Sequence, residues 1–422
     1  MAKDLFEKCH EFYQQPQLVK AAGAYPFFQE IEESAGAHVH CHGKRLIMAG
    51  SNNYLGLTHH PRVKAAAVAA LERYGTGCSG SRFLNGNTSL HVQLERNLAR
   101  FVGKPETLVF STGFMVNHGT IGCLFESEDC IFSDADNHAS IIDGCRQSRG
   151  RVIRYAHADA ADCRAKIDAT PCAGGAGIVT DGVFSMTGNI APLRELVAIK
   201  RAHPHVRIYV DDAHGLGVFG ETGRGITEHW DVQGEVDLLM GTFSKSFASI
   251  GGFVAGEPEV IEYIRHKARP LWFSASIPAA SAAAAIAALE VMSTESTHRE
   301  QLWRNCAFAR HGLEEIGMYI MPSKAPILAL WVGAEGKAFK LTMALRDLGV
   351  FATPVAYPAV PYGHALIRTS YMASHTTEDI AAIIKAFDAL ADPYQIRTTH
   401  FAQDPATLPP ADYYDLSALF AS

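Results

Sequence analysis

The sequence lacks the features that mark membrane, secreted and nucleic-acid-binding proteins. Its longest apolar stretch, about Ala279 to Leu289, is rich in alanine and too short to cross a bilayer. The N-terminus is polar and has no apolar signal-peptide core. With 37 basic and 44 acidic side chains the net charge is −7, which argues against a nucleic-acid or anionic-membrane surface. The nine cysteines form no CxxC pair, which predicts reduced cysteines in a cytoplasmic protein and no disulfide framework.

The remaining composition and patterning predict an α/β protein. The 422 residues, 48% of them hydrophobic, suffice for one large domain and a smaller one. From about residue 51 to 292, apolar runs of strand length alternate with helical periodicity, which predicts a mostly parallel sheet covered on both faces. The clearest predicted strands are Thr107–Phe110, Cys130–Ser133, Gly177–Val179, Ile208–Val210 and Leu238–Met240.

Three further segments flank this predicted large domain. Residues 1–50 read as a helix followed by a hairpin around His38–Ile47. Residues 293–395 predict a small α+β domain, and residues 396–422 a tail packed on the body or on a partner. The small domain is expected to contain a long helix (Thr297–Ile316), short strands (Ile327–Trp331 and Leu366–Thr369) and a closing helix near Thr377–Leu390.

Three residue types that could do chemistry are expected at one edge of the sheet. Lys245 lies between two serines, after an apolar run and before a Gly-Gly pair. Asp211 follows the buried run IYV, and His214 comes three residues later. Asp at a strand end is also common in simple turns. Together, however, an amine, a carboxylate and an imidazole are what a pyridoxal 5'-phosphate (PLP) site requires.

Two segments could complete such a site. Ser111–Asn117 follows the strand LVF and opens a helix, so the amides of Gly113 and Phe114 could bind a phosphate. His138, in DADNHAS, could lie over a cofactor ring, although the same segment suits a helix N-cap.

The order of eight segments resembles the α-oxoamine synthases, which are PLP enzymes of aminotransferase fold type I. The segments are SNNYLGL, YGTGCSGSRFLNG, FSTGF, NHAS, DGVFSM, VDDAHGLGVFG, GTFSKSF and ARPLWFSASIP, and the similarity runs from about residue 20 to 390. The resemblance implies a large PLP-binding domain and a small C-terminal domain. It also implies a reaction in which an amino acid joins an acyl thioester and loses carbon dioxide.

The resemblance also implies roles for individual residues. Lys245 would form the Schiff base with PLP and later move protons. Asp211 would pair with the pyridine nitrogen, His214 and Ser185 would bind the phenolic oxygen, and His138 would stack on the ring. The phosphate ligands would be Gly113, Phe114, Thr242 and Ser244, joined by Ser274 and Ser276 from the other subunit of a homodimer. Asn53 and Arg368 would bind the substrate carboxylate, for which a guanidinium fork is well suited.

The segments do not all resemble the same member of this family. SGSRFLNG, GTFSKS and ARPLWFSAS are most similar to the serine palmitoyltransferases, whereas NHASIIDG, DGVFSM and YPAVPYGHALIRTS resemble glycine C-acetyltransferase. The first similarity implies L-serine and palmitoyl-CoA as substrates. The alternative is a synthase that uses glycine, alanine or another acyl thioester, like glycine C-acetyltransferase or 8-amino-7-oxononanoate synthase. Whether the acyl donor is a CoA or a carrier-protein thioester stays open.

Other functions fit the sequence less well. Another fold-type-I enzyme, such as an aminotransferase, would share Lys245 and Asp211 but would not need the GSRF segment. A non-enzymatic paralogue would be expected to have lost Lys245. His38, His40 and His42 could share one face of a strand and bind zinc, but no distant fourth ligand is evident. We therefore expect no metal, no nucleic acid and no stable membrane insertion.

Overall fold

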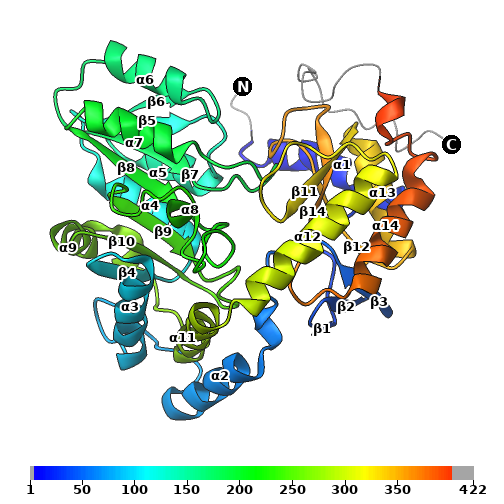
Figure 1. Cartoon of the computed structure of the whole chain (residues 1–422), viewed down its shortest axis with the longest axis horizontal. Coiled ribbons are helices and arrows are strands. Elements are labelled where there is room, and N and C mark those ends of the chain that lie inside the picture. Colours follow the sequence, from blue (N-terminus) through cyan, green and yellow to red (C-terminus); the bar gives the residue numbers. More distant parts are fainter. Residues whose placement is uncertain (1–3, 402–422) are drawn as a thin grey trace. The chain divides into compact units, whose positions relative to one another are not determined.

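The computed structural model describes residues 4–401, which form two compact units (Figure 1). The large unit comprises residues 52–185 and 189–302. The small unit comprises the residues up to 51, residues 186–188 and those from 303 onward. The N-terminal arm therefore belongs with the C-terminal residues. Most of the tail expected at 396–422 lies outside the described residues. Within residues 4–401, no helix is long and apolar enough to span a membrane.

The large unit is built on a seven-stranded sheet with the order β4-β10-β9-β8-β7-β5-β6. Its strands are β4 (Glu106–Phe110), β5 (Cys130–Asp134), β6 (Arg151–Tyr155), β7 (Ala176–Asp181), β8 (Val206–Asp211), β9 (Leu238–Thr242) and β10 (Gly252–Gly256). β10 runs antiparallel to β4 and β9, and the other neighbours are parallel. The predicted strands and the mostly parallel sheet are confirmed. Edge strand β6 and glycine-flanked β10 were not among the strands named from the sequence.

Helices connect and cover these strands. In the large unit they are α2 (Pro61–Tyr74), α3 (Ser89–Val102), α4 (Gly113–Leu124), α5 (Ala139–Gln147), α6 (Ala160–Ala169), α7 (Leu193–Ala202), α8 (Ile226–His229), α9 (Pro258–Lys267), α10 (Arg269–Trp272) and α11 (Ala279–Thr294), with the 3-10 turn η1 (Leu57–His59). One core cluster joins α4, α5 and α9 to the sheet through residues such as Val116, Ile141 and Ile261. Burying both faces explains why the strands read as continuous apolar runs.

Alanine lets α11 pack closely against α2. Ala279 and Ala283 of α11 form a buried cluster with Ala70 of α2. Small side chains permit this approach, and alanine is also the best helix former. The Ala-rich stretch is therefore a packed helix.

Arg82, in the GSRF segment, fixes its loop to the sheet. Its guanidinium forms a two-bond pair with the Glu95 carboxylate, with distances of 2.9 Å and 3.1 Å, and both side chains are about nine-tenths buried. Glu95 also accepts a 2.8 Å hydrogen bond from the amide of Val109 in β4. Because breaking one partner of such a pair leaves a buried charge, Arg82 has a clear structural role.

The small unit has two smaller sheets. The first has the order β1-β2-β3-β12 and the second β11-β14-β13. The strands are β1 (Glu33–Ala35), β2 (His38–Cys41), β3 (Lys44–Met48), β11 (Ile327–Gly333), β12 (Val350–Phe351), β13 (Thr353–Val355) and β14 (Ala365–Ser370). The helices are α1 (Glu7–Ala21), α12 (Thr297–Glu315, which begins in the large unit), α13 (Glu335–Asp347), α14 (Thr377–Ala391) and the 3-10 turn η2 (Thr398–His400). The predicted hairpin, both predicted strands and both predicted helices are present.

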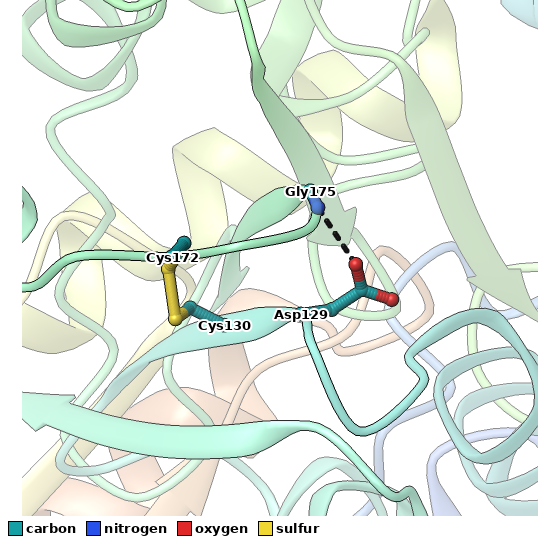
Figure 2. The surroundings of a disulfide bond; sticks show 4 residues. All are labelled: Asp129, Cys130, Cys172 and Gly175. Atoms are coloured by element: carbon teal, nitrogen blue, oxygen red, sulfur yellow. Dashed lines mark hydrogen bonds between the residues drawn. A yellow bond between two sulfur atoms is a disulfide. The ribbon is translucent and has the colours of Figure 1, made fainter.

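The structure contains one disulfide, so the prediction that all cysteines are reduced is wrong for two of them. Cys130, at the start of β5, is bonded to Cys172 in the loop before β7, with Cα atoms 6.0 Å apart (Figure 2). Next to it, the Gly175 amide donates a 2.7 Å hydrogen bond to Asp129 Oδ1. The two cysteines are 42 positions apart, and only the pairing of β5 with β7 brings them together. The other seven cysteines are free thiols.

Candidate active site

A cavity of about 330 Å³ lies at the edge of the large sheet where its parallel strands end. Parallel α/β sheets bind their ligands at this edge. Nine of the residues expected from the sequence line it, namely Gly113, Phe114, His138, Ser185, Asp211, His214, Thr242, Ser244 and Lys245. These residues come from five separate stretches of the chain, so the fold is what brings them together.

Lys245 is positioned by the aromatic residues around it. The loop between β9 and β10 buries Phe243 and Phe247, whose ring centroids are 5.3 Å apart. The Phe243 amide donates to Gly251 O at 2.9 Å, and a Cβ at Gly251 would lie 2.7 Å from the Phe243 ring. The loop is therefore anchored on both sides of Lys245. This explains why a single lysine is flanked by serines, aromatic residues and glycines: the backbone at Lys245 is fixed while its side chain lines the cavity.

The two consecutive aspartates at the end of β8 have different surroundings. Asp211 lines the cavity, whereas the carboxylate of Asp212 accepts a 2.8 Å hydrogen bond from the Ile226 amide. A Cβ at Gly225 would lie only 1.8 Å from Asp212 Oδ2, so this carboxylate fills a space that glycine leaves open. Burial raises the pKa of Asp212 well above its usual range. Successive side chains on a strand point to opposite faces, so Asp211 faces the cavity whereas Asp212 packs inside the protein.

Asp211 is held by a buried network centred on Asn117 of α4. Asn117 Nδ2 donates to Asp211 Oδ2 at 2.6 Å and to Ser140 Oγ at 2.8 Å. Asn117 Oδ1 accepts from the Tyr209 hydroxyl at 2.6 Å. The other Asp211 oxygen accepts from the Ala213 amide at 2.9 Å. Donors on both oxygens stabilise a carboxylate and fix its direction.

His214 is paired with a residue that the sequence did not single out. The Tyr54 hydroxyl lies 2.7 Å from His214 Nδ1, and the Tyr54 side chain is fully buried. The partner of one ring nitrogen sets the role of the other. Tyr54 therefore orients the His214 imidazole at the cavity wall.

His138 is the N-cap residue of α5, in the segment that the sequence marked as suited to an N-cap, and it also lines the cavity. Its Nδ1 accepts from the Ser140 amide at 3.3 Å at the start of α5. Its own amide donates to Asp181 Oδ2 at 2.7 Å. Burial, followed by the charge of Asp211, raises the pKa of Asp181 well above its usual range. Burial lowers the pKa of His138, so its ring favours the neutral form.

The start of α4 and two hydroxyl groups form an anion-binding wall. Thr112 caps the helix by accepting a 3.1 Å hydrogen bond from the Met115 amide. Thr242 Oγ1 and Ser244 Oγ lie 2.9 Å apart on the facing loop. A Cβ at Gly113 would lie 2.7 Å from Thr242 Oγ1, so only glycine allows the two segments to approach this closely. Helix amides and hydroxyls together suit a phosphate.

Four residues expected at the site do not line this cavity. Asn53, in the large unit, is buried and donates a 2.8 Å hydrogen bond to Thr58 Oγ1. Arg368 is buried on β14 in the small unit and donates to Ser370 Oγ at 2.9 Å. Ser274 is half-buried and Ser276 is buried, both between α10 and α11.

The sequence did not assign roles to Asn117, Tyr54 or Asp181. Tyr54 and Asp181 lie inside quoted segments, SNNYLGL and DGVFSM, but their partners are far away along the chain. Asn117 did leave a signal, because it is an amide in the largely apolar helix segment GFMVNHGTIGCL, and it is buried in the fold. Buried polar groups nearly always have a partner, which is reason to look for one.

The three histidines considered as a metal cluster have separate partners in the small unit. His38 Nε2 lies 2.9 Å from Asp379 Oδ1 and His40 Nδ1 lies 3.1 Å from Glu33 Oε2. His42 Nε2 lies 3.1 Å from Gln29 Oε1.

Comparisons with known proteins agree with this geometry. The model of the aminotransferase class I and II family matches residues 44–387. A serine palmitoyltransferase of Bacteriovorax stolpii is 47% identical over 371 residues, which cover 88% of each chain. An 8-amino-7-oxononanoate synthase of Thermoanaerobacter pseudethanolicus is 40% identical over 381 residues, 88% of this chain and 94% of that protein. Among solved structures, serine palmitoyltransferase from S. paucimobilis with bound PLP–myriocin aldimine has a TM-score of 0.90 at 34% identity. That match covers 93% of this chain and 100% of the other.

Proposed function

The chain belongs to the class I and II aminotransferase family and, within it, to the α-oxoamine synthases; from this premise we propose that it is a PLP-dependent serine palmitoyltransferase. The reaction joins L-serine to palmitoyl-CoA and gives 3-ketodihydrosphingosine, CoA and carbon dioxide. The observation that carries this choice is 45–48% identity to four serine palmitoyltransferases over most of the chain. The 8-amino-7-oxononanoate synthases match at 40–43%.

The side chains around the cavity fit PLP. The amine of Lys245 suits the cofactor aldehyde, and the Asp211 carboxylate, held by two donors, suits the pyridine nitrogen. The start of α4 and the hydroxyls of Thr242 and Ser244 suit the phosphate. PLP, when bound, supplies an aldehyde that condenses with amines and a ring that accepts electrons from the amino acid α-carbon. Apart from this chemistry, the protein must hold the reactants and move protons.

In this proposal each of these residues has a defined role. Lys245 Nζ would bind the cofactor aldehyde and would accept the α-proton of serine. Asp211 keeps a proton on the pyridine nitrogen, and Asn117 keeps Asp211 in place. His138 would lie over the cofactor ring, and Ser185 and His214 would bind its phenolic oxygen. Gly113, Phe114, Thr242 and Ser244 hold the phosphate.

The remaining assignments rest on the family resemblance and stay proposals. Asn53 and Arg368 are assigned to the serine carboxylate. Ser274 and Ser276 are assigned to the phosphate in the partner subunit of a homodimer, which fits the finding that neither lines the cavity of its own chain. The expected cytoplasmic location also stays a prediction.

A substrate matrix tests the proposal. The holoenzyme is offered L-serine, glycine or L-alanine with acyl-CoAs of increasing chain length, and released CoA thiol is trapped. We expect release only with serine and long acyl chains, and none from Lys245→Ala. Release with glycine and short chains would point to glycine C-acetyltransferase. Release with alanine and a shorter acyl thioester would point to the synthase of 8-amino-7-oxononanoate.

A further inference from the structure

Three metal-ligating side chains meet away from the candidate active site, where helices α2, α11 and α12 begin or end in the large unit. His60 directly precedes α2, Glu295 follows the last residue of α11, and His298 lies in the first turn of α12. One ligand atom from each lies within 4.8 Å of the others. No local pattern in the sequence marks this group, because His60 is more than two hundred positions from its partners.

His60 carries a nitrogen that the surrounding protein does not satisfy. Its Nδ1 is buried and has no hydrogen-bond partner among the described residues. Its ring packs edge-on against His298, with centroids 5.7 Å apart. A neutral imidazole with an available lone pair is the form that binds metals.

Glu295 supplies an oxygen beside these rings. Its Oε1 is paired with Arg62, while Oε2 lies 3.8 Å from His298 Nε2. The second oxygen therefore faces the imidazole, and the ion pair with Arg62 holds the carboxylate in this direction. His298 and Glu295 keep 28% and 38% of their side-chain surface exposed, so an ion can reach the site from solvent.

We propose that His60, Glu295 and His298 bind one divalent transition-metal ion, with Zn²⁺ as the best match and water as the fourth ligand. Two imidazoles and one carboxylate are a zinc ligand set, whereas Ca²⁺ and Mg²⁺ prefer oxygen ligands alone. Ligands at about 2.0–2.1 Å from a tetrahedral ion lie about 3.3 Å from each other. The three ligand atoms must therefore move closer together, by small side-chain rotations, when the ion binds.

The ion would fasten the start of α2 to the connection between α11 and α12. The segment that carries Asn53 and Tyr54 leads directly into α2 through η1. Since Tyr54 is hydrogen-bonded to His214, the site lies on the same short stretch of chain as a residue of the cavity wall. Its role is structural, and the proposal does not depend on the reaction that the enzyme catalyses.

Binding of Co²⁺ and Zn²⁺ to the full-length holoenzyme, without a histidine tag and after chelator treatment, tests the proposal. We expect one Co²⁺ per chain, with the strong visible bands of a four-coordinate ion, displacement by Zn²⁺, and a higher unfolding temperature with Zn²⁺. His298→Gln and Glu295→Gln should each weaken Co²⁺ binding by at least about tenfold, because even the loss of an outer-shell partner of a metal ligand costs that much. His60→Gln should do the same, and the two other variants decide the matter if it does not fold.

A matched control is His266→Gln. His266 Nδ1 lies 3.3 Å from Glu262 Oε1 on α9, so this variant removes an exposed imidazole next to a carboxylate without touching the proposed site. Its Co²⁺ affinity should equal that of the unmodified chain. The proposal is overturned if no single Co²⁺ binds, or if His298→Gln and Glu295→Gln bind it as tightly as the unmodified chain.

Discussion

Asn117 donates a 2.6 Å hydrogen bond to Asp211, the carboxylate proposed to face the cofactor nitrogen. The same amide group accepts from Tyr209, so one side chain ties the carboxylate to the core of the sheet. A carboxylate that must keep a proton on a neighbouring base needs to stay ionised and directed. The network around Asn117 fixes the direction of this carboxylate.

Replacing Asn117 should therefore weaken cofactor binding. A hydrogen bond to a charged group contributes about 1.5–3 kcal/mol, so Asn117→Ala should raise the PLP dissociation constant by about tenfold or more. The measurement is a PLP titration of apoenzyme, with thermal unfolding of the same apoprotein to separate affinity from stability. An unchanged PLP affinity would show that Asp211 does not need this partner.

Tyr54 should act on turnover through His214. Tyr54→Phe keeps the ring and removes only the hydroxyl at 2.7 Å from the imidazole. The lost hydrogen bond, which contributes about 1 kcal/mol to the orientation of the His214 ring, should lower kcat about three- to tenfold and change its pH profile. The matched control is Tyr74→Phe, which removes a hydroxyl bonded to Ser89 at 2.7 Å far from the cavity. Equal effects of the two variants would contradict the positioning role.

Stability should fall on mild acidification because of buried neutral histidines. Burial lowers the pKa of His91 to about 4, and its Nε2 donates to Ile277 O at 3.1 Å. Burial likewise lowers the pKa of His375 to about 4. Since these pKa values are depressed in the fold, the unfolded chain takes up more protons between about pH 6.5 and 4. The free energy of unfolding should drop there by about 1.4 kcal/mol per pH unit and histidine.

Thermal unfolding of the holoenzyme at about pH 7.5 and 5.5 measures this dependence. His91→Gln should reduce the difference between the two conditions, and His266→Gln, which removes an exposed imidazole, should not. A difference that is the same in His91→Gln and in the unmodified chain would refute the assignment.

The disulfide can be tested by counting the free thiols. Unfolding without reductant in the presence of an alkylating agent should modify seven of the nine cysteines, and all nine after reduction. Closing a loop of 42 residues should stabilise the fold by about 2–4 kcal/mol. Cys172→Ser should therefore lower the unfolding temperature more than Cys9→Ser, which changes an exposed free thiol. Nine modified cysteines before reduction would contradict the bond.

The sequence was informative wherever a short stretch determines both structure and chemistry. Apolar runs predicted β5, β7, β8 and β9, and the polar residues near their ends pointed to Asp211, His214 and Lys245. Other residues that line the cavity, such as Ser185 and Thr242, were expected only from the family resemblance. It was less informative where a partner is distant. Nothing local pairs Asn117 with Asp211, Tyr54 with His214, or Cys130 with Cys172, since tertiary packing alone brings them together. β6 is charged and lies at an edge, so its pattern does not read as a buried strand.

The most direct test of the central claim uses L-serine labelled with carbon-13 in its carboxyl group, together with palmitoyl-CoA. The account predicts labelled carbon dioxide and an unlabelled 3-ketodihydrosphingosine in equal amounts, detected by mass spectrometry, with neither formed by Lys245→Ala. Palmitoyl-CoA left intact, or a product that keeps the labelled carboxyl carbon, would contradict it.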